Sequence, residues 1–340
     1  MSPPQNQHYV SQVLLRRFTV SGRLQCYHVQ TEKWIQPKSP RKVLAARGWN
    51  QLLVSGEADN TLEAGFSRVE THLPKTFEAL EEAVNRPLTK LPQAIYENMC
   101  LYCTFLWLTS PFAKAKAVPD FVLQMDRELQ NGKSELLREL GIPEMIIDGF
   151  RKSRSFGNRV IIDSRKFLQL IYRIQFRLSF PYSYSLFLNS IEWTVCNSPI
   201  ELPVSDIALV QLGRKDLNAV CYILPIGPRL LLKGKIDCGP QKNSSQPHIK
   251  GENLTPGEAE YWLHAICLSA LTEMIGSRKI DVPTIRSRAK RSGITFPTIV
   301  SPELLISAGL TDFSTNFGFK VVSADEYTKF FHSFIRPAAP

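Results

Sequence analysis

The sequence lacks the features that mark secreted and membrane proteins. Its seven cysteines are odd in number and irregularly spaced, which argues against a disulfide framework and predicts a reducing compartment. The first residues show no charged and apolar signal pattern. The longest apolar run, residues 99–108, is too short to cross a bilayer. We therefore expect a cytoplasmic protein with no membrane partner.

Several catalytic signatures are also missing. The sequence contains no Walker-type phosphate loop, no HExxH motif and no Gly-x-Ser-x-Gly elbow, which removes ATPases, zinc proteases and ordinary hydrolases from the expected classes. Cys100 and Cys103 form one CxxC pair, but no second pair and no histidine pair completes a zinc site. We interpret these two cysteines as core residues.

Acidic residues are scarce, above all near the N-terminus. The 340 residues include 41 Lys and Arg but 31 Asp and Glu, a formal net charge of +10, and Glu32 is the one acid among the first fifty residues. A second basic run contains Arg286, Arg288, Lys290 and Arg291. Such charge attracts polyanions, DNA or RNA first, although a charge run can also be a solvated face.

The stretch from Gln7 to Phe18 combines polar and apolar periodicity. Val10, Leu14 and Phe18 fall on one helical stripe, whereas Gln12 and Arg16 share another face. His8 precedes the expected helix, next to main-chain N–H groups that a helix start leaves unpaired. A histidine in this place is either a cap or surface residue, or part of a site.

The same stretch resembles the opening signature of a bacterial family known as domain of unknown function 4238. That signature reads His-Tyr-Val-Pro-Gln, then Leu-Arg, then Phe. Here it is matched by His8, Tyr9, Val10, Gln12, Leu15, Arg16 and Phe18, with Ser11 in place of the proline. Three later segments resemble further family motifs: Val69–Glu70, Pro203–Asp206 and Pro225–Pro228. The resemblance covers nearly the whole chain and implies one fold with a shared site, without a settled activity.

The expected fold class is α+β, with a mainly helical body and a small mixed or antiparallel sheet. We expect an N-terminal helix and hairpin over 1–58, a helical body over 59–180, and a strand-rich part with C-terminal helices over 181–340. These are loose subdivisions of one family-wide domain. Strands are expected within 23–36 and 183–233, including Ser185–Leu188, because both parts are rich in strand formers.

The candidate site residues are His8, Gln12, Glu70 and Asp206. Asp206 is expected at the end of a strand, where loops gather site residues, although Asp also favours turns for local reasons. Glu70 shares a helix face with Glu63, but the two lie about 10 Å apart along the axis and cannot easily bind one ion. Alternatively, Glu63 and Glu70 are simply surface carboxylates.

These residue types predict a metal-dependent nuclease or related phosphodiester hydrolase, for example a bacterial antiviral effector. His8, Gln12 and Asp206 are the candidate catalytic residues; Glu70 and Asp206 would hold Mg²⁺ or Mn²⁺. The candidate nucleic-acid contacts are Arg16, Arg17, Arg286, Arg288, Lys290 and Arg291. Two alternatives stay open: a non-enzymatic binder of nucleic acid or protein, and a structural pair of His8 and Asp206.

Overall fold

The computed structural model describes residues 6–47, 52–54, 57–59, 61–110, 180–181, 183–214, 219–236 and 247–291, with single positions within 113–148 and at 294. The chain divides into two compact units. The first comprises residues 1–50, 61–111 and 180–297 and holds every element discussed below except one hairpin. That hairpin pairs β5 (Leu52–Val54) with β6 (Glu57–Asp59) and belongs to the second unit.

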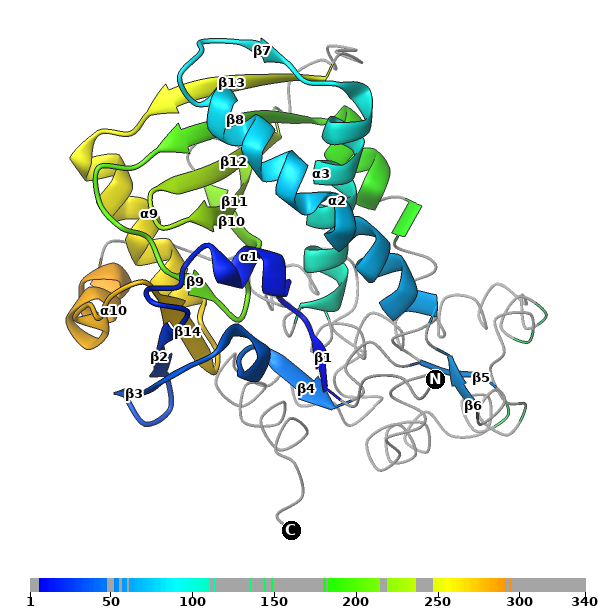
Figure 1. Cartoon of the computed structure of the whole chain (residues 1–340), viewed down its shortest axis with the longest axis horizontal. Coiled ribbons are helices and arrows are strands. Elements are labelled where there is room, and N and C mark those ends of the chain that lie inside the picture. The colour runs from blue at the N-terminus through cyan, green and yellow to red at the C-terminus, as the bar shows by residue number, and fades with distance from the viewer. Residues whose placement is uncertain are drawn as a thin grey trace. The chain divides into compact units, whose positions relative to one another are not determined.

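A long amphipathic helix, α2 (Thr61–Ala83), crosses the first unit (Figure 1). Its large apolar residues recur every three or four positions, and every one of them is buried: Leu62, Phe66, Val69, Leu73, Phe77 and Leu80. The helix continues through Pro74, which lies on the exposed side. The hydrogen bond that proline removes is therefore lost where water can replace it.

The second long helix, α3 (Gln93–Thr109), is buried along most of its length and packs on α2. Its Tyr102 ring stacks on Phe66 of α2, with 6.2 Å between the ring centroids. Cys100 and Cys103 are completely buried on α3. Burial raises the pKa of both thiols, so they behave as core residues and not as a reactive pair.

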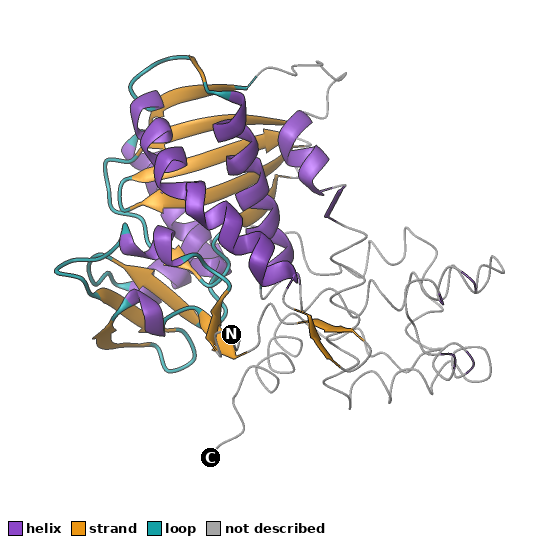
Figure 2. Ribbon diagram, turned by 45° about the vertical axis from the view of Figure 1, so that its right-hand side comes forward, coloured by secondary structure: helices purple, strands orange, loops and turns teal. Residues whose placement is uncertain are grey.

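Six strands form a mixed sheet in the order β10-β11-β12-β8-β13-β7. Its members are β7 (Thr89–Lys90), β8 (Ile191–Asn197), β10 (Val210–Arg214), β11 (Ala219–Gly227), β12 (Leu230–Ile236) and β13 (His248–Asn253). All neighbours are antiparallel except β8 and β13, which run parallel. Figure 2 shows helices packed against this sheet.

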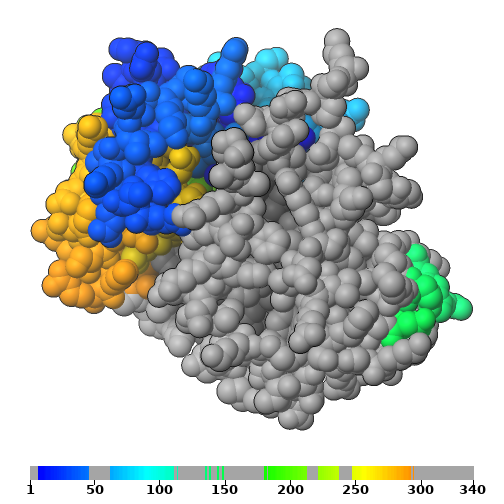
Figure 3. All heavy atoms as spheres, turned by 90° about the horizontal axis from the view of Figure 1, so that it is seen from below, coloured from blue at the N-terminus to red at the C-terminus, as the bar shows by residue number. Residues whose placement is uncertain are grey.

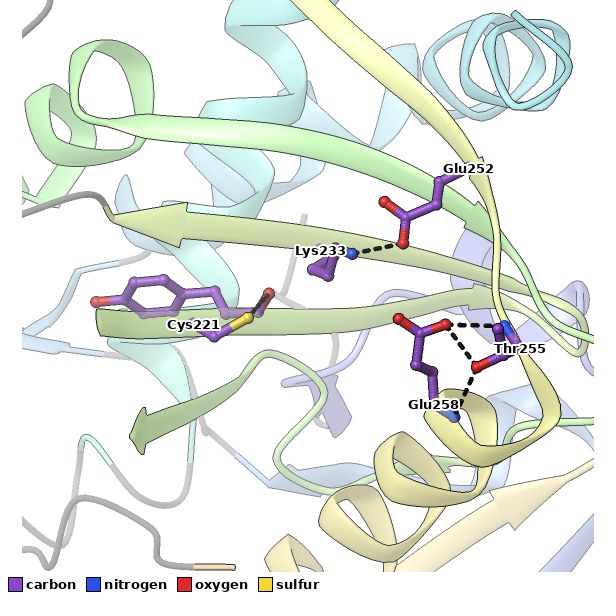
Figure 4. Close-up of polar contacts among 6 residues, drawn as sticks. Cys221, Lys233, Glu252, Thr255 and Glu258 are labelled. Carbon is purple, nitrogen blue, oxygen red and sulfur yellow. Dashed lines mark hydrogen bonds and ion pairs between the residues drawn. The ribbon is translucent and has the colours of Figure 1, made fainter. Parts of the chain in front are cut away.

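The two faces of this sheet meet different helices. On one face, Tyr222 of β11 contacts Trp107 of α3, at 5.8 Å between ring centroids. On the other face, Lys233 of β12 donates to Glu252 of β13 at 2.7 Å (Figure 4). The pKa of Glu258, in the first turn of the helix after β13, is lowered mainly by hydrogen bonds from Thr255. The nearby positive charge of Lys233 lowers it further.

Helix α9 (Pro256–Ser269) begins at a capping box formed by Thr255 and Glu258. The Thr255 hydroxyl accepts from the Glu258 N–H, and the Glu258 carboxylate accepts from the Thr255 N–H at 2.9 Å. Helix α9 leads into β14 (Glu273–Gly276), which pairs with two other parts of the chain. The described helices include none that is long and apolar enough to span a membrane.

A second, four-stranded sheet has the order β3-β2-β14-β9 and is antiparallel throughout. It joins β2 (Leu24–His28) and β3 (Lys33–Lys38) to β14 and to the short β9 (Val204–Ser205). The α+β class is therefore confirmed, but the N-terminal strands pair with β14 and not with the main central strands. Those central strands form their own six-stranded sheet.

The N-terminal segment itself is short on regular structure. It contains β1 (Asn6–His8), α1 (Gln12–Arg16), the 3₁₀ turn η1 (Pro40–Lys42) and β4 (Ala45–Arg47), which pairs with β1. The predicted helical stripe extends beyond α1, because Val10 and Phe18 are buried although they lie outside the helix. The final helix is α10 (Val282–Arg291).

One strand prediction is wrong. Residues 183–189, which include Ser185–Leu188, are helical, and the Ser190 N–H bonds to the Leu186 carbonyl at 2.9 Å. A short apolar run does not distinguish a strand from a buried helix. The expected helical body is described only at single positions within 111–179, and the part of the chain beyond residue 294 lies outside the described residues.

Gly251 of β13 allows this strand to lie against the end of α2. A Cβ atom there would lie 2.3 Å from the Arg86 carbonyl oxygen and 2.4 Å from that of Ala83. We expect Gly251→Ala to lower the free energy of unfolding by about 1–3 kcal/mol, measured by urea denaturation. The control is Gly257→Ala in the first turn of α9, where a Cβ meets nothing within 4 Å. An equal, small effect of both changes would contradict this packing.

Candidate functional site

The candidate site forms where α1 begins. His8, at the end of β1, is partly buried beneath η1, and its Nε2 lies 3.2 Å from the Pro40 carbonyl oxygen. A carbonyl only accepts, so Nε2 carries the proton of the neutral ring and Nδ1 carries the lone pair. Burial lowers the pKa of His8 from its ordinary value of 6.5, although main-chain hydrogen bonds to Pro40 and Arg41 oppose the shift. The imidazole is therefore neutral at pH 7 and able to accept a proton.

Gln12, the first residue of α1, connects His8 to the neighbouring carboxylate. Its side-chain Nε2 lies 3.4 Å from the His8 Nδ1. Its main-chain N–H donates to Glu70, which approaches from α2. The structure thus brings together three of the four predicted residues, His8, Gln12 and Glu70, within the first compact unit.

Glu70 is held by the N-terminal end of α1. The buried Ser11 caps this helix by accepting from the Val13 N–H at 3.1 Å, and its hydroxyl group hydrogen bonds to Glu70. Burial raises the pKa of Glu70 from its ordinary value of 4.5. Glu63 raises it further, whereas the hydrogen bonds and the nearby Arg16 charge lower it. The carboxyl group can therefore keep its proton at higher pH than a solvated Glu.

Two further residues surround Glu70. Arg16 is exposed in the last turn of α1, where its charge acts on Glu70. Tyr102 of α3 is buried and has Ser11 and Glu70 as neighbours. Burial, reinforced by the Glu70 charge, raises the pKa of Tyr102 well above 10.0, so the phenol keeps its proton. The site therefore contains a neutral imidazole, a carboxyl group, a phenol and a guanidinium.

Asp206 lies at the end of β9, as predicted, but its side chain is committed to the protein's own main chain. It is 1% exposed. Its Oδ1 accepts from the Leu271 N–H at 2.9 Å, and its Oδ2 accepts at 2.6 Å from both the N–H and the hydroxyl group of Thr272. Burial raises the pKa of Asp206, and these hydrogen bonds oppose the shift. Asp206 holds the turn between α9 and β14.

Glu70 and Asp206 together do not fit a shared metal ion. A hard cation needs carboxylate oxygens that can turn toward it, whereas those of Asp206 already accept three hydrogen bonds. Within the described ranges, no group of three His, Cys, Asp or Glu side chains is placed to hold a metal ion. The predicted pairing of His8 with Asp206 is also not seen among the hydrogen bonds of these two described residues.

The basic residues separate into anchored and exposed groups. Arg17 donates to the Ile226 carbonyl and to Glu81, and its guanidinium lies 5.0 Å from the centroid of the Phe77 ring. Arg286 of α10 donates to the carbonyls of Cys267 and Ala270 at 2.6 and 3.1 Å, which satisfies the end of α9. By contrast, four of the predicted nucleic-acid contacts are exposed: Arg16, Arg288, Lys290 and Arg291.

Sequence reasoning did not find three features of this region. Ser11 interrupts the family signature, yet its hydroxyl group joins α1 to Glu70. Tyr102 lies on the buried α3, and its neighbour Ser11 belongs to a segment far away in the sequence. The third feature is a groove beside Arg17, described below, whose walls come from four separate segments.

The fold and the site define an α+β protein whose polar site lies at the start of a short N-terminal helix against a long one. The chain belongs to the family described as "Protein of unknown function (DUF4238)", whose model matches residues 6–288. His8, Gln12, Glu70 and Asp206 all lie inside this range. Neither the curated proteins nor the solved structures contain a significant match.

Proposed function

We propose that this protein cleaves phosphodiester bonds in nucleic acid by general acid–base catalysis. The observation that supports the proposal is the meeting of His8 and Glu70 at Gln12, beside the exposed Arg16. Their pKa values are shifted in opposite directions, His8 downward and Glu70 upward. Each shift favours the form that its role needs, the free imidazole for a base and the protonated carboxyl group for an acid.

The proposed base is His8. Its Nδ1 takes the proton of the attacking hydroxyl group, while the hydrogen bond from Nε2 to Pro40 fixes the ring. Gln12 occupies the Nδ1 side at 3.4 Å, a long contact that an incoming hydroxyl group can displace. Gln12 therefore acts as a positioning residue in this proposal.

The proposed acid is Glu70, which gives its proton to the leaving oxygen atom. The Arg16 guanidinium pairs with the phosphate oxygens. Its charge also lowers the pKa of Glu70, but a bound phosphate would neutralise Arg16 and so remove that effect. Substrate binding is thus expected to favour the protonated carboxyl group.

The first test is cleavage of labelled single-stranded RNA and DNA by the purified full chain and by His8→Ala. We expect wild-type cleavage and a loss of about 10²–10⁴-fold in His8→Ala, the usual contribution of a general base. Circular dichroism and thermal melting check that the variant is folded. Parallel reactions with EDTA, Mg²⁺ or Mn²⁺ test the metal dependence.

A second candidate function is nucleic-acid binding without turnover. Arg288, Lys290 and Arg291 are exposed on α10. In Figure 3, the N-terminal residues (blue) adjoin the 250–291 segment (yellow to orange), so two basic parts of the chain share one face. Affinity that falls steeply with salt, with intact substrate after long incubation, would favour this function and contradict the first.

A further inference from the structure

A groove of about 490 Å³ lies beside the Arg17 ion pair. Its floor includes the turn between β11 and β12, Gly227–Leu230, and its walls include Arg17, Glu81 and Glu201. Gly227 has no Cβ atom, and one added there would lie 3.4 Å from a guanidinium nitrogen of Arg17. Arg17 therefore lies against this turn, within van der Waals distance of such an atom.

The lining of the groove holds two arginines and two carboxylates, and Arg278, outside the lining, adds one positive charge beside it. Each of its carboxylates already has an arginine partner: Glu81 pairs with Arg17, and Glu201 lies 3.2 Å from the Arg278 Nε. Arg229, also in the lining, is exposed and donates from one nitrogen to the Pro199 carbonyl at 3.1 Å. No carboxylate within the described residues forms an ion pair with Arg229. Arg229 is thus the guanidinium best placed to bind an anion.

The groove and the candidate site lie along the same helix pair. Glu70 and Glu81 are eleven residues apart on α2, which is about three turns, so both fall on one face about 16 Å apart. The segment from Gln12 to Arg17 lies along α2, because Gln12 is a neighbour of Glu70 and the long Arg17 side chain contacts Phe77 and Glu81. Arg16 lies near the Glu70 end, and Arg17 lines the groove.

We propose that this groove binds a phosphate of the substrate strand, about five nucleotides or fewer from the bond that is cleaved. The proposal rests on the proposed function and adds a second contact point for a single-stranded phosphodiester chain. A strand advances about 3.4 Å per nucleotide in a duplex and further when extended, so roughly 16 Å corresponds to this range. Arg229 contributes the phosphate contact, and Arg17 with its ion pair forms the fixed wall.

The test is fluorescence anisotropy with labelled single-stranded oligonucleotides of 2 to 12 nucleotides. Binding is measured on the full chain carrying His8→Gln, with Glu70→Gln as a second background, so that cleavage does not interfere. We expect affinity to rise in a step once the oligonucleotide can reach the groove. Arg229→Gln is expected to remove this step. The affinity for long oligonucleotides then falls about fivefold, and the affinity for dinucleotides stays the same.

Two further variants make the result specific. Glu201→Gln removes a negative charge from the groove and is expected to strengthen binding of long oligonucleotides, the opposite sign from Arg229→Gln. Arg23→Gln removes the same charge as Arg229→Gln from an exposed turn outside the groove lining and is expected to leave the step in place. The groove assignment would be overturned if Arg229→Gln and Arg23→Gln lowered the affinity equally. It would also be overturned if Arg229→Gln lowered the affinity for short and long oligonucleotides equally. Absence of cleavage by the wild type, with the step intact, would overturn the proposed function instead.

Discussion

Replacing Asp206 by alanine is expected to lower the free energy of unfolding by about 3–5 kcal/mol, the range observed when a buried charged partner is removed. The carboxylate is 1% exposed and accepts hydrogen bonds from Leu271 and Thr272. Without it, two main-chain N–H groups and one hydroxyl group lose their acceptor inside the protein. Urea denaturation followed by circular dichroism measures the change.

The matched control is Asp281→Ala. Asp281 is exposed, and its Oδ1 accepts a single main-chain hydrogen bond, from Thr284 at 3.3 Å. Its loss is expected to cost about 1 kcal/mol, the usual value for a helix cap. The loss of unfolding free energy in Asp206→Asn is expected to lie between those of these two variants. Its amide keeps one acceptor oxygen, but its NH₂ group then faces a hydrogen-bond donor. A stable Asp206→Ala protein that has lost only activity would contradict the structural role.

Replacing Glu70 by glutamine is expected to lower the rate of phosphodiester cleavage by about 10²–10⁴-fold, because an amide does not supply the proton. Glutamine keeps the shape and can still accept from Ser11 and Gln12, so the fold is expected to survive. Initial rates on labelled RNA, measured as a function of pH, provide both the magnitude and the shape of the change.

The pKa shifts predict a bell-shaped pH profile for the wild type. Burial lowers the pKa of His8 below 6.5, so the base gains activity as pH rises through that lowered value. Burial raises the pKa of Glu70 above 4.5, so the acid loses activity as pH rises through that raised value. The optimum is expected between the pKa values of these two groups. Glu70→Gln should lose the decline at high pH, and His8→Gln should lose the rise at low pH.

A profile that keeps both limbs in Glu70→Gln would contradict the role of Glu70 as the acid. Ser67→Ala is the matched control, since Ser67 is an exposed residue of α2 about one turn before Glu70. We expect it to leave the rate and the profile unchanged.

Local patterns in the sequence predicted several elements of the fold well. The apolar stripe of α2 and the capping box at Thr255 and Glu258 depend on residues within a few turns of each other. Such periodicity and cap signals carry their own physical cause, because helix geometry places these residues together. The strand formers around Cys26, Trp193 and Tyr222 likewise lie in strands β2, β8 and β11.

The pairing of strands far apart in the chain could not be predicted from such local patterns. Strand β2 pairs with β14, about 250 residues away, and nothing in either strand selects that partner over β8. The helical conformation of Ser185–Leu188 depends on its packing against the core, where Phe187 is completely buried between Trp193 and Tyr222. In both places, tertiary contacts decide what local propensity leaves open.

In the candidate site, too, some features follow from local sequence and others depend on long-range contacts. His8 and Gln12 could be selected because they match the family's opening signature and carry polar groups, and the structure joins them. Asp206 could be selected for its place at a strand end, but its burial against Leu271 and Thr272 depends on the return of the chain after α9. The polarity of Ser11, by contrast, was visible in the sequence as the departure from a proline.

The central claim is that His8 and Glu70 act as one catalytic pair. A double-mutant cycle tests it most directly: cleavage rates of wild type, His8→Gln, Glu70→Gln and the double variant on one RNA substrate at the optimum pH. Residues that act as a unit are strongly non-additive, so the double variant should be about as slow as the slower single variant. Losses that multiply, or no loss at all, would contradict the claim.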